Sequence, residues 1–166
     1  MLITDEYRAL NARAHEDDPQ WGSTGHFYAE LVQQMIATYD TRDVLDYGCG
    51  VRSLEKALGH PIGNYDPAIP ACAAPPEAHD IVVCTDVLEH IEPDCVTDVL
   101  AHLRALTRKV ALLVICNVPA KKILPDGRNA HVTVQPARWW LKALAAAGFS
   151  PSRVGGDMST LVVLAV

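Results

Sequence analysis

Hydrophobic positions along the chain follow two different spacings. Between His26 and Tyr39 they recur every three or four residues, which predicts an amphipathic helix with one apolar side. Short unbroken apolar runs, such as Ile81–Cys84 and Val110–Cys116, are instead typical of strands that are buried on both faces of a parallel sheet. Because the two patterns alternate along the chain, the sequence predicts strands joined by helices.

Glycines, prolines and capping residues set the limits of the predicted elements. The predicted helices are a polar one over residues 4–16, then His26–Tyr39, Ser53–Leu58, a helix that Asp94 caps and that runs to Leu106, and one from Pro136 to Ala147. The predicted strands are Val44–Leu45, Ile62–Asp66, Ile81–Cys84, Val110–Cys116, Phe149–Val154 and Leu161–Val166. Residues 67–79 and 117–132 are predicted to be loops.

The order of these elements predicts the fold class. The last two strands are separated only by Gly155–Met158, which favours a hairpin and hence an antiparallel pair at one end of the sheet. The other strands alternate with helices, so we expect a doubly wound, mostly parallel α/β sheet of about six strands with right-handed crossovers. The 166 residues suit a single domain, which we divide into an N-terminal helical cap (1–40) and a core (41–166).

Composition and charge argue against several classes of function. The net charge of −6 argues against a strongly basic nucleic-acid-binding face. No apolar run approaches the roughly 18–20 residues that cross a bilayer, and the first residues do not read as a secretory signal. Five cysteines without a CxxC pair favour free thiols in a reducing compartment, so we expect a cytoplasmic protein with neither a membrane nor a nucleic acid as partner.

Candidate chemistry gathers where the predicted strands end. The first strand runs into Asp46-Tyr47-Gly48-Cys49-Gly50, and its glycines allow a sharp turn and close approach to a ligand. Asp66 ends the next strand, where a carboxylate can accept hydrogen bonds from both hydroxyls of a ribose. Asp86 follows the third strand. A GxG turn is weak evidence by itself, and Ser53 replaces the third glycine of a dinucleotide fingerprint.

Taken together, these segments resemble the class I S-adenosylmethionine-dependent methyltransferases, and the likeness covers about residues 22–166. Their motifs correspond to Val44–Gly50 at the first strand, Asp66 at the second, Asp80–Ile91 in the version seen in small-molecule methyltransferases, and Ala147-Gly148-Phe149 before a late strand. The resemblance implies a Rossmann-like fold and an enzyme with S-adenosyl-L-methionine as cofactor. It also implies in-line transfer of a methyl group to a small molecule or an exposed terminal group.

The resemblance also assigns cofactor contacts to individual residues. The methionine part would lie against Asp46, Gly48, Cys49 and Gly50, with the segment from Gly22 to Gly25 closing over its carboxylate end. The ribose would be held by Asp66, and the region of the transferred methyl would be faced by Thr85 and Asp86. Only thirteen residues separate Asp66 from Asp80, where the family fits a further helix and strand. We therefore expect that unit to be missing and Pro67–Ile69 to cover the adenine instead.

The acceptor side of the site is predicted from the polar loop that follows Val110–Cys116. We predict His131 to bind the acceptor or act as general base, with Asp86 as the second catalytic residue, and Arg128 and Asn129 to orient the acceptor. His90 is predicted to form hydrogen bonds beside the cofactor as a substrate-binding residue. The pair Glu89-His90 also suggests metal ligands, but neither HxxxH nor CxxC spacing accompanies it, so no metal is predicted.

Two other functions stay open at this point. One is a catalytically silent subunit that binds S-adenosylmethionine within a larger complex. The other is an NAD-binding oxidoreductase, against which both Ser53 and the lack of a second substrate domain argue.

Overall fold

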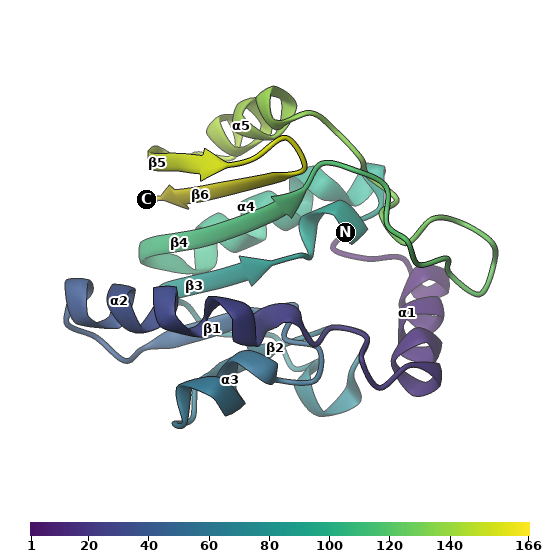
Figure 1. The fold of residues 1–166 in the computed structure, drawn as a ribbon, viewed down its shortest axis with the longest axis horizontal. Coiled ribbons are helices and arrows are strands. Elements are labelled where there is room, and N and C mark those ends of the chain that lie inside the picture. Colours follow the sequence, from purple (N-terminus) through teal and green to yellow (C-terminus); the bar gives the residue numbers. More distant parts are fainter.

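The computed structural model describes residues 1–166 and contains one six-stranded sheet between two layers of helices (Figure 1). The strands are β1 (Val44–Tyr47), β2 (Gly63–Tyr65), β3 (His79–Thr85), β4 (Thr107–Cys116), β5 (Pro151–Gly156) and β6 (Thr160–Ala165). The α-helices are α1 (Asp5–Asp17), α2 (Ala29–Tyr39), α3 (Ser53–Leu58), α4 (Val96–Leu106) and α5 (Ala137–Ala146). Four short 3-10 turns are η1 (Thr24–Tyr28), η2 (Pro70–Cys72), η3 (Leu88–His90) and η4 (Pro93–Cys95).

The strand order is β2-β1-β3-β4-β6-β5. Strands β1 to β4 pair in parallel, whereas β6 is antiparallel to both β4 and β5. This arrangement confirms the predicted mostly parallel sheet with a C-terminal hairpin. From β1 the chain moves outward to β2 and then returns to β3 on the other side of β1, so the strand order reverses between β1 and β3. Ligands of open α/β sheets bind at such a point.

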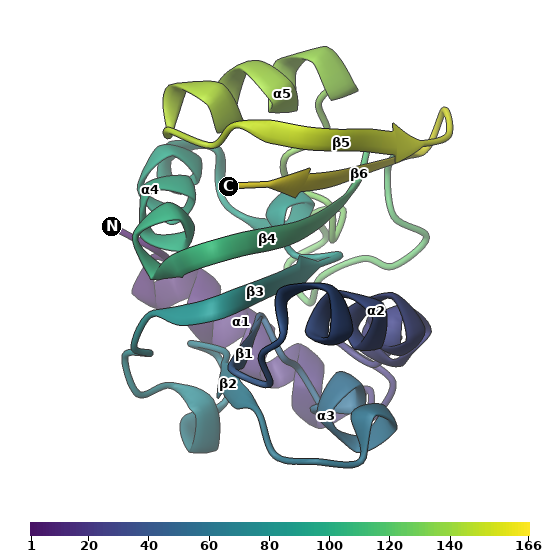
Figure 2. The same cartoon turned by 90° about the vertical axis from the view of Figure 1, so that its left-hand side faces the viewer.

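Alternation along the central strands explains the two layers. Val82 and Cys84 of β3 belong to a core shared with α4 and α5, whereas Ile81 and Val83 belong to a core shared with α2 and α3. Since neighbouring residues of a strand point to opposite faces, an apolar run serves both layers. Figure 2 shows the strands running between these helices.

Two predicted helix starts are wrong. The helix predicted from His26 begins at Ala29, because residues Thr24–Tyr28 form η1, and Phe27, expected on the apolar side, is 74% exposed. The backbone at Gly25 packs so closely on Ser53 of α3 that a side chain there would be crowded, and the tight 3-10 turn follows that contact. Asp94 does not cap α4 either, since it lies within η4 and Cys95 precedes the helix.

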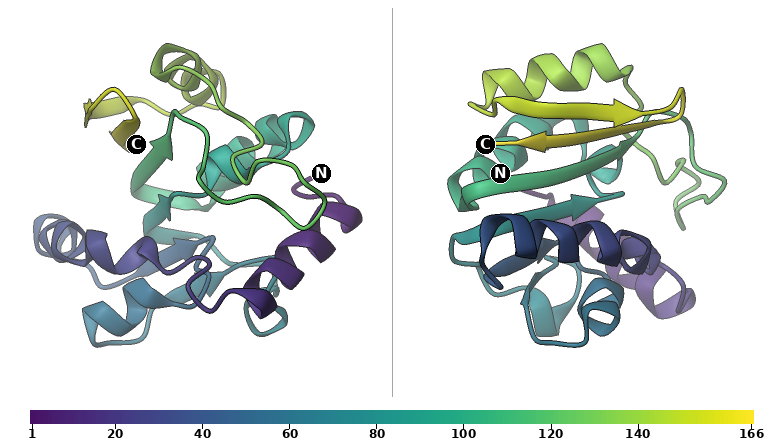
Figure 3. Two further views of the ribbon diagram at one scale, coloured as in Figure 1. Left: turned by 45° about the vertical axis from the view of Figure 1, so that its right-hand side comes forward. Right: turned by 60° about the vertical axis from the view of Figure 1, so that its left-hand side comes forward.

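Helix α1 lies across the carboxyl ends of the parallel strands, where the loop after β4 meets it (Figures 1 and 3). Thr4 caps the helix through Tyr7 N–H and also donates its own backbone N–H to Glu92 at 2.9 Å. The ring of Tyr7 packs in one buried cluster with Leu124 and Ala130 of the loop. These contacts hold α1 over the edge of the sheet where the ligand site was predicted.

A helix that crosses a membrane has to be both long and apolar. Among the helices of the structure, none combines the length and the apolar character that crossing a bilayer demands.

A carboxylate is buried in the central sheet. Asp46 of β1 is only 4% exposed, and its burial, together with the negative charges of Asp66 and Glu55, raises its pKa to about 7. In an unfolded chain an aspartate has a pKa of about 3.9. The folded protein therefore keeps a proton on Asp46 that the unfolded chain has lost, over the window from about pH 4 to pH 7.

Stability should fall through that window because the folded state binds the extra proton. We expect the free energy of unfolding of the cofactor-free protein to decrease as the pH rises from 5 to 8. The Asp46→Asn variant, which cannot ionise, should gain stability relative to the wild type over the same range, by on the order of 2–4 kcal/mol. Urea unfolding at both pH values checks this. The exposed Asp94→Asn variant is the control, and an equal pH dependence in Asp46→Asn and wild type would contradict the assignment.

Candidate functional site

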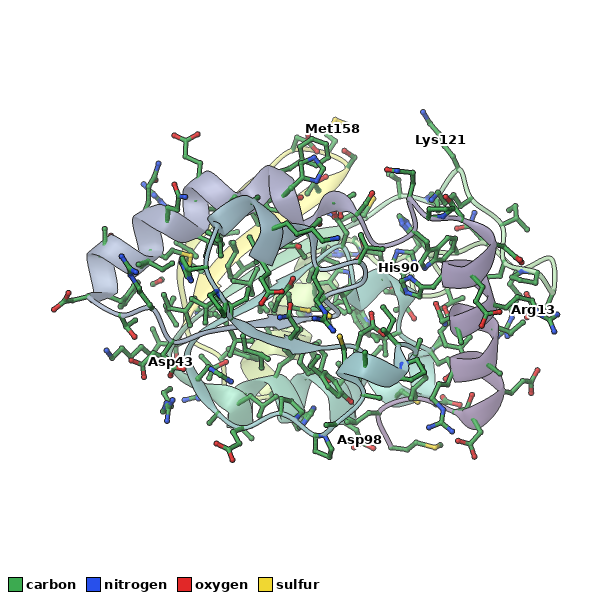
Figure 4. The ribbon with its side chains drawn as sticks, turned by 90° about the horizontal axis from the view of Figure 1, so that it is seen from below. Arg13, Asp43, His90, Asp98, Lys121 and Met158 are labelled. Atoms are coloured by element: carbon green, nitrogen blue, oxygen red, sulfur yellow. The ribbon has the colours of Figure 1, made fainter.

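A pocket of about 500 Å³ lies at the carboxyl ends of the parallel strands. The glycine turn after β1, the end of β2, the turn η3 and the loop after β4 form its walls, and α1 covers it. Figure 4 shows His90 in the interior beside α1, whereas Arg13 and Lys121 point outward. The pocket thus occupies the point of reversed strand order at which the sequence predicted the site.

The glycine turn is held by backbone contacts that only glycine permits. The N–H groups of Gly48 and Cys49 both donate to the carbonyl of Tyr65 in β2, at 2.7 and 3.1 Å. Gly50 has a φ of 48° and packs against the backbone of Gly22, where a Cβ atom would overlap the Gly22 carbonyl. The segment before η1 therefore closes directly on the turn, and glycine at both positions allows the two backbones to meet.

Asp66 stands at the end of β2 and is 8% exposed. Its carboxylate accepts the N–H of Gly50 at 3.2 Å and that of Ala68 at 3.0 Å, so its orientation toward the pocket is fixed. Each carboxylate oxygen can accept more than one hydrogen bond, which leaves capacity for hydroxyl groups of a ligand. His15 of α1 places its Nε2 atom 3.9 Å from the same carboxylate.

The predicted site residues divide into two groups. Those that line the pocket are Gly22, Gly48, Gly50, Asp66, Pro67, Asp86, His90 and His131. Those that do not line it are Gly25, Asp46, Cys49, Thr85, Arg128 and Asn129. Of the second group, Asp46, Cys49 and Thr85 are buried in the strands and the turn that support the pocket.

Arg128 and Asn129 hold the loop after β4 together. The Asn129 amide accepts the N–H of Ala120 at 3.0 Å and donates to its carbonyl at 2.9 Å. Arg128 pairs with Asp126 at 2.6 Å, and its guanidinium lies over the ring of Tyr7, 5.3 Å from the centroid. In this structure both side chains satisfy groups of the loop and of α1, so the acceptor contacts predicted for them have no direct structural support.

Three polar side chains meet at the other end of the pocket, near η3. Glu89 is completely buried, and one of its oxygens accepts the N–H of Cys116 at 2.9 Å. The rings of His90 and His131 lie edge to face with centroids 4.8 Å apart. Burial lowers the pKa of His90 to about 4, so its imidazole is neutral at pH 7. Asp86 adjoins this group with a positive φ of 55°, and burial raises the pKa of its carboxyl.

Sequence reasoning missed the residues that α1 contributes. Tyr7, Asn11 and His15 line the pocket, and their spacing of four residues places them on one face of the helix. That spacing was visible in the sequence, but the docking of α1 over the strand ends was not. Trp21 also lines the pocket, with its ring 6.1 Å from that of His90.

Comparison with solved structures shows the same fold in methyltransferases. A crystal structure of 1,6-didemethyltoxoflavin-N1-methyltransferase from Burkholderia thailandensis, with bound 1,6-didemethyltoxoflavin and S-adenosylhomocysteine, matches with a TM-score of 0.69 and 19% identity, over 99% of this chain and 90% of that one. Magnesium protoporphyrin IX methyltransferase from Synechocystis PCC 6803, with bound S-adenosylhomocysteine, matches with a TM-score of 0.59 and 19% identity, over 85% of this chain and 82% of that one.

Comparison by sequence gives the family. No curated protein matches the chain significantly. A family model described as "Methyltransferase domain" matches residues 21–153, which include the glycine turn, Asp66, Asp86 and the loop with His131. The chain therefore belongs to the methyltransferase-domain family that its strand-end motifs predicted.

Proposed function

We propose that this protein is an enzyme that transfers a methyl group from S-adenosyl-L-methionine to a small-molecule acceptor. The observation that carries the proposal is one pocket with the glycine turn and Asp66 at one end and a group of imidazoles and carboxylates at the other. The two compared methyltransferases, which hold S-adenosylhomocysteine and in one case a small-molecule acceptor, support it.

The residues present suit this cofactor. Gly48 and Gly50 give the methionine part a backbone surface without side chains, and Gly22 closes over it. The carboxylate of Asp66, held by the N–H of Gly50, would accept the ribose hydroxyls, and Pro67, which also lines the pocket, would lie against the adenine. Asp46, Cys49 and Thr85 support these contacts from below, while Gly25 seats η1 on α3. The acidic surroundings also favour a cationic ligand.

The chain's own residues then have to align an acceptor. When bound, S-adenosylmethionine supplies an activated methyl group on a sulfonium leaving group. The pocket walls would have to hold the attacking atom in line with the methyl group, at about 3 Å from it. The Nδ1–H of His131 donates to the Val118 carbonyl at 2.6 Å, which leaves Nε2 as the nitrogen able to take a proton from an acceptor hydroxyl. Asp86 is the neighbouring carboxylate, and burial raises the pKa of its carboxyl.

The acceptor end of the pocket indicates the class of acceptor. Leu2, Ile3 and Tyr7 contribute an apolar wall from the N-terminal segment and α1, opposite the polar group at η3. A concave site with apolar and polar lining suits a small molecule better than a polymer. The five unpaired thiols support a cytoplasmic location.

Asp66 provides a test of the cofactor site. We expect S-adenosylhomocysteine to bind the wild type and Asp66→Asn to bind it roughly 10–100 times more weakly, because hydrogen bonds to a charged group contribute about 1.5–3 kcal/mol. Calorimetry measures both, with the exposed Asp94→Asn variant as control and circular dichroism to verify folding. Unchanged affinity in Asp66→Asn would contradict the ribose contact, and tight binding of NAD instead would favour the oxidoreductase.

His131 provides a test of catalysis. With labelled S-adenosylmethionine and a small-molecule extract as the source of acceptor, we expect His131→Ala to lower the turnover rate by roughly 10²–10⁴. Its affinity for S-adenosylhomocysteine should change little, because the contacts proposed for the cofactor are made by the glycine turn and Asp66 and not by His131. His60→Ala, after α3 and outside the pocket, is the matched control. Full activity in His131→Ala would refute its role, and turnover that appears only with a second protein would identify a silent subunit.

A further inference from the structure

Glu89, His90 and His131 form a cluster of metal-ligating side chains inside the pocket. Each residue offers one ligand atom, and the three atoms lie within 4.8 Å of one another. Two of the residues are neighbours in η3, and the third comes from the loop after β4, one strand later in the chain. The fold therefore brings together ligands that sequence spacing alone did not reveal.

The two imidazoles are held as metal ligands usually are. The Nδ1–H of His90 donates to the Ala130 carbonyl at 2.8 Å, and that of His131 donates to the Val118 carbonyl at 2.6 Å. Because a carbonyl can only accept, both bonds fix the proton on Nδ1 and leave the lone pair on Nε2. Histidines that bind metals almost always donate their other ring N–H to a carbonyl or carboxylate in this way.

Glu89 supplies the second, independent observation. Its side chain is completely buried, yet only one carboxylate oxygen has a partner, the N–H of Cys116. The other oxygen, Oε2, is buried and makes no hydrogen bond. An ionised carboxylate left in this state is costly, and a cation beside it removes the cost.

We propose that Glu89, His90 and His131 bind a divalent transition-metal ion at the acceptor end of the pocket. Two imidazole nitrogens and one carboxylate oxygen form a ligand set that suits Zn²⁺, Fe²⁺ and related ions and leaves coordination positions open. Metal–ligand bonds of about 2.0–2.2 Å require the three side chains to draw closer together when the ion binds. Asp86, whose carboxyl interacts electrostatically with both Glu89 and His131, adds negative charge beside the ion.

The ion would also determine which acceptors bind. This extension of the proposal rests on the proposed function. Open coordination positions that face the pocket bind oxygen atoms, so the acceptor would be a molecule that presents a hydroxyl or another oxygen donor. A metal lowers the pKa of a bound hydroxyl, and the resulting oxyanion is the stronger nucleophile. A nitrogen that holds a metal cannot also take a proton, so His131 acts as a ligand when the ion is bound, and the proton of the hydroxyl passes to solvent water. The general-base role proposed above then applies only to the metal-free site.

Metal binding is tested directly on the tag-free full-length protein after treatment with a chelator and dialysis. We expect Zn²⁺ and Mn²⁺ titrations in a calorimeter to show one ion per chain, and Co²⁺ to give absorption bands of a protein-bound ion. Glu89→Gln keeps the side-chain volume and the acceptor for Cys116 N–H but removes the charge. Loss of a residue that only hydrogen-bonds to a metal ligand weakens metal binding roughly 10–100-fold. Because Glu89→Gln and His131→Ala each remove a ligand itself, we expect each to weaken metal binding by more than that.

The controls are His60→Ala and Glu77→Gln, which lie outside the pocket and should bind the ion as the wild type does. Binding that is absent, or equally strong in all variants, would overturn the proposal. Thermal melting shows whether each variant is folded. S-adenosylhomocysteine titrations on the same samples separate the two proposals: loss of metal binding with retained nucleoside binding refutes the ion alone.

Activity distinguishes the two roles of His131. If the residue is a ligand, a chelator should abolish methyl transfer by the wild type, and added metal should restore it. If the residue is a base, transfer should persist in the chelator while His131→Ala stays inactive, and that result would overturn the metal's part in the reaction.

Discussion

The hydrogen bond from the Gly50 N–H to the carboxylate of Asp66 is the contact on which the rest of the site depends. It joins the turn after β1 to the end of β2, beside the point where the strand order reverses. Gly50 can make this bond only because its backbone adopts a positive φ with Gly22 packed against it. The same bond uses part of the capacity of the carboxylate and directs the remainder into the pocket. A structural contact between two strands thus also orients the group proposed to hold the ribose.

Because the sheet ends at β2, the pocket needs a further element to cover it. Strand β2 lies at the edge, and the segment from Pro67 to β3 contains only the turn η2 where the resembling family has a further helix and strand. The pocket therefore has less wall on this side than a longer sheet would provide. Helix α1 covers it from another direction and is fixed by Thr4 to Glu92 and by Tyr7 to the loop after β4. His15, placed near Asp66, shows that this cover reaches the proposed ribose end.

Local patterns predicted the sheet well because its determinants are local. The apolar run Ile81–Cys84 supplies both core layers by simple alternation, and the short link before β6 permits only a hairpin. Long-range contacts were not predictable in this way. A polar loop near a site often binds ligands, and on that ground Arg128 and Asn129 are predicted to contact the acceptor. In the ligand-free structure Asn129 bonds the backbone of Ala120 and Arg128 pairs with Asp126, so their contact with an acceptor stays a prediction. Only tertiary structure separates these two uses of a polar side chain.

Each end of the pocket has a buried carboxylate close to it. Asp46 lies buried beneath the proposed cofactor end and Glu89 beside the proposed acceptor end, and burial raises the pKa of both. A fold that needed only stability would favour apolar residues at such positions, since an unpaired buried carboxylate opposes folding. A cation at each of the two proposed sites would remove this cost, the sulfonium of the proposed cofactor at the turn that follows Asp46 and the proposed metal ion at Glu89. In the ligand-free protein the raised pKa values keep both carboxyls largely protonated below pH 7, so binding of a cation beside either of them would be coupled to the loss of its proton.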